Sequence, residues 1–231
     1  MNKLEAINKL VLANKILSNE NIIEAFGHIS VRNPENEQEF LLSRSRAPQL
    51  VTADDIMRHD FDGKVLDKTH RPYGERMLHA KIFEARPDVQ AICHHHAPQL
   101  LPFTTTGIEL KPVVHMGYMF YEGVPLYDDY DVSDGMLITG PKEGERVART
   151  LGNKRALLMR GHGVIVVGSS IEEVVMSSIF ITYNAEALYK SLQIGTPKYL
   201  SFEEGKAATE RTFSPLALER AWEYWSARCN P

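Results

Sequence analysis

The chain has 231 residues, 43% of them hydrophobic and 24% charged, which are ordinary proportions for a globular protein and exclude a disordered or fibrous one. A formal net charge of −4 gives no overall basic field, so we expect no nucleic-acid partner. No run approaches the ~18 apolar residues of a membrane-spanning helix, so we expect no membrane partner either. Early charges break any signal-peptide core, and Cys93 and Cys229 cannot form a disulfide framework, so we expect a reducing, cytoplasmic location.

Hydrophobic spacing and turn residues predict the elements in chain order. The first part of the chain is expected to form a helix over 3–17, a short helix over 20–25, extended runs at 27–32 and 39–45, a turn at 52–55 and a hairpin over 57–65. The middle is expected to form a helix over 74–85 and strands at 89–96, 112–115, 124–127 and 136–138. The last part is expected to form a helix over 141–150, strands at 156–159 and 164–167, and helices over 170–193 and 215–228.

This order of elements indicates a fold class. Strands and helices alternate irregularly with several hairpins, which is typical of a layered α/β protein with a mixed or antiparallel sheet. The chain contains neither a Gly-x-Gly-x-x-Gly motif nor a Walker loop, which argues against a doubly wound dinucleotide fold. The length suits one domain with room for a short appendage.

The densest chemical signal is the run His94-His95-His96. On a strand, residues two apart point to the same face, so His94 and His96 can converge on one point, roughly 6–7 Å apart at the backbone. Two imidazoles on one face make half of a site for zinc or a similar divalent ion. A partly exposed polar strand end without a ligand explains the spacing equally well.

A catalytic metal site commonly takes a third protein ligand, and His162 is the best candidate. It lies between Gly161 and Gly163, which let the backbone bend sharply and leave the imidazole uncrowded. By itself, such a histidine belongs more often to an ordinary turn. His115 is a second candidate, but its apolar neighbours favour a hydrogen-bonded core or interface histidine over a metal ligand.

Glu75 begins the helix expected over 74–85 and shares a helix face with His79, four residues later. The helix dipole favours a carboxylate there, while the functional interpretation is a general acid or base beside a metal. Arg44 and Arg46 alternate with serines on a strand end. Their guanidiniums suit a bidentate contact with a carboxylate or phosphate, or simply form a charged, solvated edge.

Three blocks of sequence together resemble the class II aldolase/adducin family. The first is Gly27-His28-Ile29-Ser30-Val31-Arg32, the second is Glu75 followed 19 residues later by His94-x-His96, and the third is Arg160-Gly161-His162-Gly163 before a long helix. The similarity runs from about residue 5 to about residue 195. It implies an α/β class II aldolase-like fold, an α/β/α sandwich around a central, mainly antiparallel β-sheet, in a domain over 1–195. Residues 196–231 would form a helical extension packed on this domain or on a neighbouring subunit.

The resemblance also implies a site. His94, His96 and His162 would bind one divalent metal ion per subunit, usually zinc, and Glu75 would be the acid/base. Manganese, iron and cobalt also suit three histidine ligands. The family commonly forms tetramers or stacks of them, with sites near subunit interfaces, so we expect a homo-oligomer acting on a small molecule.

Departures from the sugar-phosphate aldolases point to the reaction. The hydroxyl-rich loops that cradle phosphate in those enzymes are largely replaced here, with Phe26 and His28 standing where small or amide residues are usual. The segments Pro72-Tyr73-Gly74-Glu75-Arg76 and Pro112-Val113-Val114-His115-Met116 look most like a decarboxylase-like branch acting on hydroxy-aromatic or pyridine dicarboxylates. In this interpretation Arg44 and Arg76 hold a carboxylate, and His28 and His115 orient polar substituents.

We therefore expect a metal-dependent carbon–carbon lyase that decarboxylates an unphosphorylated hydroxy-aromatic or related carboxylate. One alternative is a class II aldolase for an unphosphorylated hydroxy-carbonyl substrate, because retro-aldol cleavage uses the same metal chemistry. A second alternative is a non-catalytic adducin-like scaffold, which would be expected to have lost the metal ligands. All four of the residues Glu75, His94, His96 and His162 are present.

Overall fold

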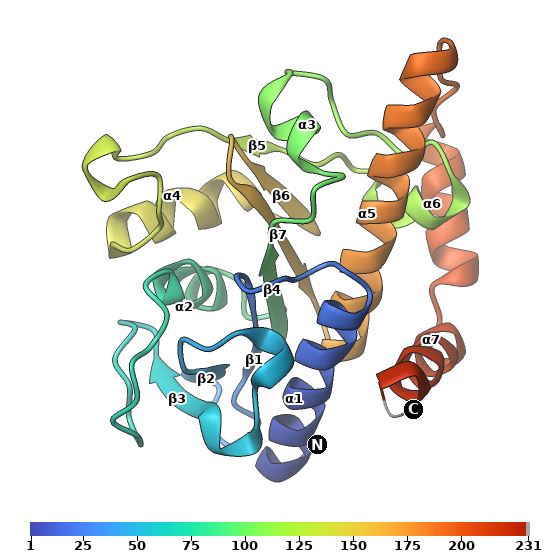
Figure 1. Cartoon of the computed structure of the whole chain (residues 1–231). Coiled ribbons are helices and arrows are strands. Elements are labelled where there is room, and N and C mark those ends of the chain that lie inside the picture. Colours follow the sequence, from blue (N-terminus) through green and yellow to red (C-terminus); the bar gives the residue numbers. More distant parts are fainter. Residues whose placement is uncertain (230–231) are drawn as a thin grey trace.

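Seven strands form one central sheet in a computed structural model of the chain, which describes residues 1–229 (Figure 1). Their order across the sheet is β3-β2-β1-β4-β7-β6-β5. The strands are β1 (His28–Arg32), β2 (Glu39–Ser43), β3 (Ile56–Asp60), β4 (Ala91–His95), β5 (Leu126–Tyr127), β6 (Ala156–Met159) and β7 (Gly163–Gly168). Every neighbouring pair is antiparallel except β5 with β6, so the expected mainly antiparallel sheet is confirmed.

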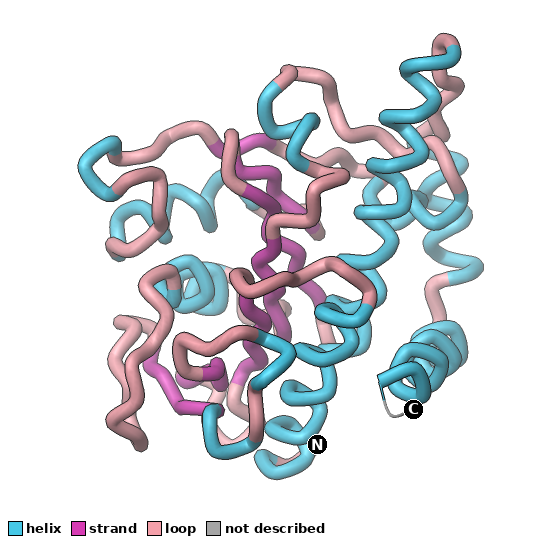
Figure 2. Tube along the Cα trace, viewed as in Figure 1, coloured by secondary structure: helices cyan, strands magenta, loops and turns pink. Residues whose placement is uncertain are grey.

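Helices cover both faces of this sheet, which lies between them in Figure 2. They are α1 (Lys3–Asn19), α2 (Arg76–Ala85), α3 (Leu101–Thr105), α4 (Pro141–Leu151), α5 (Ile171–Ile194), α6 (Phe202–Thr212) and α7 (Pro215–Cys229). Buried residues of α1 and α5 share one apolar core with the sheet, and those of α2 and α4 share the other. The α/β/α sandwich is therefore confirmed.

Alternation along the central strand decides which side chains reach which core. Ala91 and Cys93 of β4 pack toward α1 and α5, whereas Ile92 packs toward α2 and α4. His94 has the parity of Ile92 and so emerges on the α2 side of the sheet. Antiparallel pairing places His28 of β1 opposite His94, so His28 shares that face.

The short helix expected over 20–25 is wrong. The first helix continues to Asn19, and Asn21 then adopts a left-handed conformation with φ of 57°. The backbone N–H of Ile22 turns back to donate to the carbonyl of Leu17 at 2.9 Å. The chain thus reverses direction in a tight cap, which brings the 22–27 segment back toward the sheet.

Two of the expected strands are also wrong, because their backbone groups find partners outside the sheet. At 112–115 the N–H groups of Val113 and Val114 donate to the side-chain carbonyl of Asn184 on α5, so no neighbouring strand is needed. At 136–138 the chain is a loop, because Met136 is left-handed with φ of 66°. At 124–127 the strand is shorter than expected, because β5 covers only Leu126–Tyr127.

The C-terminal region contains a helix that the sequence prediction omitted. Helix α6 begins at a capping box in which Ser201 and Glu204 exchange side-chain and backbone hydrogen bonds. Helix α7 packs against α1 and α5 and buries Trp225. The last two residues of the expected 196–231 extension lie outside the described residues. Within residues 1–229, no helix has the length together with the hydropathy that a bilayer crossing requires.

Candidate active site

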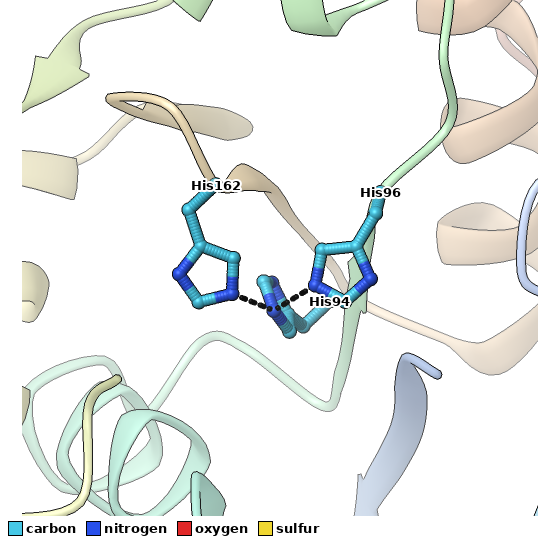
Figure 3. Close-up of side chains that lie close together, drawn as sticks. All are labelled: His94, His96 and His162. Atoms are coloured by element: carbon cyan, nitrogen blue, oxygen red, sulfur yellow. Dashed lines mark hydrogen bonds between the residues drawn. The ribbon is translucent and has the colours of Figure 1, made fainter. Parts of the chain in front are cut away.

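Three histidines converge at one end of the central strands (Figure 3). His94 belongs to β4 and His96 follows its end, while His162 lies in the tight turn between β6 and β7. Because β7 pairs with β4, that turn lies beside the end of β4. The turn depends on Gly163, where an added Cβ would lie only 2.5 Å from the carbonyl oxygen of His95.

The ring nitrogens face one another at close range. The Nε2 atom of His94 lies 3.0 Å from Nε2 of His96 and 3.3 Å from Nε2 of His162. The Nδ1 atom of His94 lies 3.0 Å from the carbonyl of Val164, and Nδ1 of His162 lies 3.1 Å from the carbonyl of Met136. A carbonyl only accepts, so both Nδ1 atoms carry a proton, and the tautomer that this fixes for an uncharged ring has its lone pair on Nε2, the atom that faces the other ring.

This donor set suits a divalent cation. Lone pairs that face one another at 3.3 Å repel unless a positive charge lies between them. Nitrogen ligands about 2.0–2.1 Å from one ion in tetrahedral geometry stand about 3.4 Å apart. Carbonyl groups that accept from the far ring nitrogen are also the usual supports of metal-binding histidines. The three side chains therefore fit a metal with an imidazole-ligand preference.

The electrostatics keep the imidazoles in the form that binds metal. Burial, reinforced by the adjacent His94, lowers the pKa of His96 to about 3. The same causes lower the pKa of His162 below its ordinary value. Both rings are therefore neutral near pH 7, with a nitrogen lone pair available for coordination.

Glu75 completes the cluster from the N-terminus of α2, where it is the residue that precedes the first helical turn. Its Oε2 lies 3.6 Å from Nε2 of His94 and 3.7 Å from Nε2 of His162. Its Oε1 accepts a hydrogen bond of 3.1 Å from the backbone N–H of Ile138. Burial by itself would raise the pKa of this carboxyl, whereas His94 and His162 in their protonated forms lower it, and the net direction is downward.

A cavity of about 360 Å³ opens onto this cluster. Its polar wall is formed by His28, Glu75, His96 and His162. The remaining wall is formed by apolar or small residues, namely Phe26, Gly27, Tyr73, Gly74 and Leu137. Three carbon-rich side chains and four polar ones thus line the same space, which is of small-molecule size.

The other predicted substrate ligands lie elsewhere in the structure. The Nε atom of Arg44 pairs with the carboxylate of Asp55 at 2.5 Å, and Arg46 pairs with the other oxygen of the same carboxylate. Arg76 donates to the backbone carbonyls of Gly63 and Tyr73. Neither Arg44 nor Arg76 lines the cavity.

His115 is likewise outside the cavity of its own chain. It begins a 3-10 helix at His115–Phe120, is exposed, and packs edge-on against Tyr118 at 5.0 Å between ring centroids. His28, in contrast, lies 3% exposed at the back of the cavity, with its ring 5.2 Å from that of His94. The structure therefore brings together Glu75, the three histidines and His28.

Sequence reasoning missed part of this wall. Leu137 belongs to a segment expected to be a strand, yet the left-handed Met136 before it forms the loop whose carbonyl orients His162. The same loop supplies the N–H of Ile138 to Glu75. The Asp134-Gly135 dipeptide before Met136 is a local signal of a turn, whereas the backbone contacts themselves leave no trace in side-chain patterns.

Comparisons with known proteins agree with this architecture. The profile of the Class II Aldolase and Adducin N-terminal domain matches residues 8–189. Decarboxylase tropJ of Talaromyces stipitatus is 31% identical over 238 residues, covering 91% of this chain and 88% of that protein. The 3,4-dihydroxyphthalate decarboxylase of Arthrobacter keyseri is 28% identical, covering 74% of this chain and 73% of that one.

Solved structures show the same fold. L-fuculose 1-phosphate aldolase from Glaciozyma antarctica PI12 superposes with a TM-score of 0.84, covering 98% of this chain and 89% of its own. The two sequences are 24% identical, so this likeness concerns the fold alone.

Proposed function

This chain belongs to the class II aldolase and adducin family, and we propose that it is a divalent-metal-dependent lyase that decarboxylates an unphosphorylated hydroxy-aromatic carboxylate. The enzyme class rests on family membership and on relatives named as decarboxylases. The observation that carries the substrate class is the cavity, in which the histidine cluster and Glu75 face an apolar wall containing Phe26 and Tyr73.

His94, His96 and His162 would hold the metal, whose chemistry when bound is that of a Lewis acid for an oxygen next to the breaking bond. The carbonyls of Val164 and Met136 fix two of these rings through Nδ1, so the ligand nitrogens keep their direction as substrate enters. Zinc is the first candidate, with manganese, iron and cobalt as the others that the donor set accepts.

Glu75 would move the proton. Glu75 is a carboxylate in the free enzyme, and in this proposal its Oε2 first takes the proton of the substrate hydroxyl. It then gives this proton to the ring carbon that bears the carboxylate, the C–C bond breaks, and CO2 leaves while its bonding electrons restore the aromatic ring. The substrate oxygen regains a proton from water. The Ile138 N–H holds Oε1 and so aims Oε2 during both transfers.

The cavity wall also argues against a phosphorylated sugar. Among the residues that line it within 1–229 there is no lysine or arginine, and its hydroxyl groups are limited to Tyr73. A phosphate dianion would lose its water without gaining a cation or a ring of donors in return. A planar ring, by comparison, finds aromatic and aliphatic surface on Phe26, Tyr73 and Leu137.

The finer assignments complete the proposal. His28 would contact a polar substituent of the substrate from inside the cavity. Arg44 and Arg76 would act as carboxylate ligands only after exchanging their present partners, Asp55 and two backbone carbonyls. We assign the enzyme to the cytoplasm and to a homo-oligomer, a tetramer or a multiple of it, in which the exposed His115 would face a neighbouring subunit's cavity.

Metal content is the first test. Protein purified without added metal or chelator should contain about one divalent ion per chain. A His162→Ala variant should lose it, and His70→Ala, which changes an exposed histidine, should keep it. Absence of metal in the wild type, with none taken up on titration, would overturn the proposal and favour a non-catalytic scaffold.

The reaction is tested next with the loaded enzyme. Release of CO2 from 3,4-dihydroxyphthalate or a related hydroxy-aromatic carboxylate is the expected result. Release of an aldehyde from hydroxy-keto acids without CO2 would contradict decarboxylation and identify an aldolase instead. Chelation should abolish either activity, and metal addition should restore it.

A further inference from the structure

A buried polar chain runs from the cavity into the protein through His28. The Nδ1 atom of His28 lies 2.6 Å from Nε2 of His79, and Nδ1 of His79 lies 2.7 Å from the hydroxyl oxygen of Ser30. His28 and Ser30 are two apart on β1 and share its α2-facing side, and His79 lies one helical turn after Glu75 on α2. Only His28 reaches the cavity, since Ser30 and His79 are fully buried.

Counting protons shows which group donates in each of these two hydrogen bonds. Each contact holds one hydrogen, so either Ser30 donates to His79 and His79 donates to His28, or both hydrogen bonds run in the opposite direction. If His79 donated to Ser30, the serine hydroxyl would need another acceptor, and the structure of residues 1–229 provides no other hydrogen bond to that oxygen. If Ser30 donates to Nδ1 of His79, then Nε2 of His79 donates to Nδ1 of His28, and every buried hydrogen has a partner.

The same count fixes the number of protons on each ring. A doubly protonated His79 would donate to Ser30 and leave the serine hydrogen without an acceptor, and His28 accepts at Nδ1, so each ring carries one N–H. A neutral His28 that accepts at Nδ1 must carry its proton on Nε2. That nitrogen is the one left for the cavity.

We propose that Ser30 and His79 are positioning residues that hold His28 in its Nε2–H form, so that His28 donates a hydrogen bond to an oxygen of the bound substrate. The acceptor is a carboxylate or phenolate oxygen, and this identity rests on the proposed function. A histidine free to choose its tautomer would present a lone pair to the same oxygen for part of the time and repel it. We call the hydrogen bonds from Ser30 to His79 and from His79 to His28 the relay. The relay fixes the tautomer of His28, so that its Nε2 acts only as a hydrogen-bond donor.

The tautomer is directly measurable. Zinc-loaded protein labelled with ¹⁵N-histidine is examined by solid-state NMR, with the His28 signals identified from their loss in His28→Gln. The expected result is a protonated Nε2 and an unprotonated, hydrogen-bonded Nδ1 for His28. In Ser30→Ala a population with protonated Nδ1 should appear, and Ser30→Thr, which keeps the hydroxyl, should restore the wild-type form. Protonated Nδ1 in the wild type, or an unchanged spectrum in Ser30→Ala, would overturn the relay.

A pair of substitutions at position 79 tests the consequence for substrate. In His79→Gln the amide can still accept from Ser30 and donate to His28, whereas His79→Met has similar size but neither group. With 3,4-dihydroxyphthalate as the probe, we expect His79→Met to lower kcat about 10²-fold, as for loss of one donor to a developing charge, with His79→Gln within about tenfold of wild type. Equal losses in both variants, with metal content unchanged, would contradict a positioning role.

The NMR experiment and the activity measurement together distinguish a failure of this inference from a failure of the proposed function. If the probe is not decarboxylated and His28 is nevertheless in the Nε2–H form, the reaction assignment is wrong and the relay stands. If decarboxylation occurs and His28 carries its proton on Nδ1, the reaction stands and the relay is wrong.

Discussion

The carboxylate of Glu75 and the imidazole of His94 lie 3.6 Å apart, Oε2 to Nε2, although 19 positions separate them in the chain. The first lies at the start of α2 and the second at the end of β4, so the helix and the strand both point their functional ends at one cavity. The separation is longer than a hydrogen bond, which leaves Oε2 free to exchange a proton with a substrate.

Replacing Glu75 with glutamine tests its role as the proton carrier. Glu75→Gln keeps the size and the Ile138 contact but cannot take a proton, so kcat should fall about 10²–10⁴-fold while metal content stays near wild type. The measurement is CO2 release beside elemental analysis. Glu84→Gln, an exposed change on the same helix, is the control and should retain full activity. Normal turnover by Glu75→Gln would remove this residue from the mechanism.

Phe26 offers a test of the aromatic substrate class. Its side chain is 76% exposed at the rim of the cavity, so truncation creates no internal void and should change stability by less than about 0.5 kcal/mol. Phe26→Ala should raise KM for a hydroxy-aromatic carboxylate up to about tenfold, with metal content unchanged, because one aromatic contact is lost. Phe202→Ala removes an exposed aromatic on α6 and should leave KM unaltered. An unchanged KM in Phe26→Ala would argue against ring stacking at the rim.

How far the sequence predicts this structure depends on the range of the interactions. The spacing of His94 and His96, and the glycines around His162, are local signals, and in the structure these side chains do come together. The segments at 112–115 and 136–138 failed as strands because their backbone partners are distant. The side chain of Asn184 satisfies one segment, while Glu75 and His162 contact the other.

The arginines show the same limit. The alternation of serine and arginine at 43–46 suggested guanidiniums available to a ligand. In the structure Asp55, at the end of the short 3-10 helix Ala53–Asp55, pairs with both Arg44 and Arg46. No pattern in the sequence distinguishes a paired arginine from one that awaits a ligand. Helix α6, in contrast, could have been predicted from the sequence. The spacing of Ser201 and Glu204 at its start is a recognisable capping signal, which the prediction omitted.

The turn that carries His162 depends on a residue without a side chain. An alanine Cβ at Gly163 would lie 2.5 Å from the His95 carbonyl oxygen and 2.8 Å from the His96 ring. The start of β7 would therefore have to move away from His95 and His96. Gly163→Ala should lower the unfolding free energy by about 1–3 kcal/mol and weaken metal binding. Denaturant melts and metal titration measure both effects. Gly195→Ala, where nothing lies within 4 Å of the added carbon, should leave metal binding unchanged. Unaltered metal affinity in Gly163→Ala would show that the turn tolerates displacement.

Acid sensitivity should come in part from His59, which is fully buried on β3 and stacks on Phe40 at 5.0 Å between ring centroids. Burial lowers its pKa to about 4. The unfolded chain, with an ordinary pKa of about 6.5, therefore binds this proton more readily than the folded one. The contribution of His59 to stability is full above the unfolded value and is lost as pH falls from about 6.5 toward 4, by about 3 kcal/mol in total.

A variant isolates this contribution from the other titrating groups. His59→Phe keeps a ring against Phe40 but has no proton to bind, so its unfolding free energy should fall less steeply than that of the wild type between pH 6.5 and 4. The comparison is made in chelator, so that acid-driven metal loss does not add to the slope of either protein. Equal slopes would mean that His59 is protonated in the folded chain or remains unprotonated in the unfolded one. A shallower slope in His59→Phe alone locates one acid-labile group in the core beneath β2 and β3, away from the histidines that face the cavity.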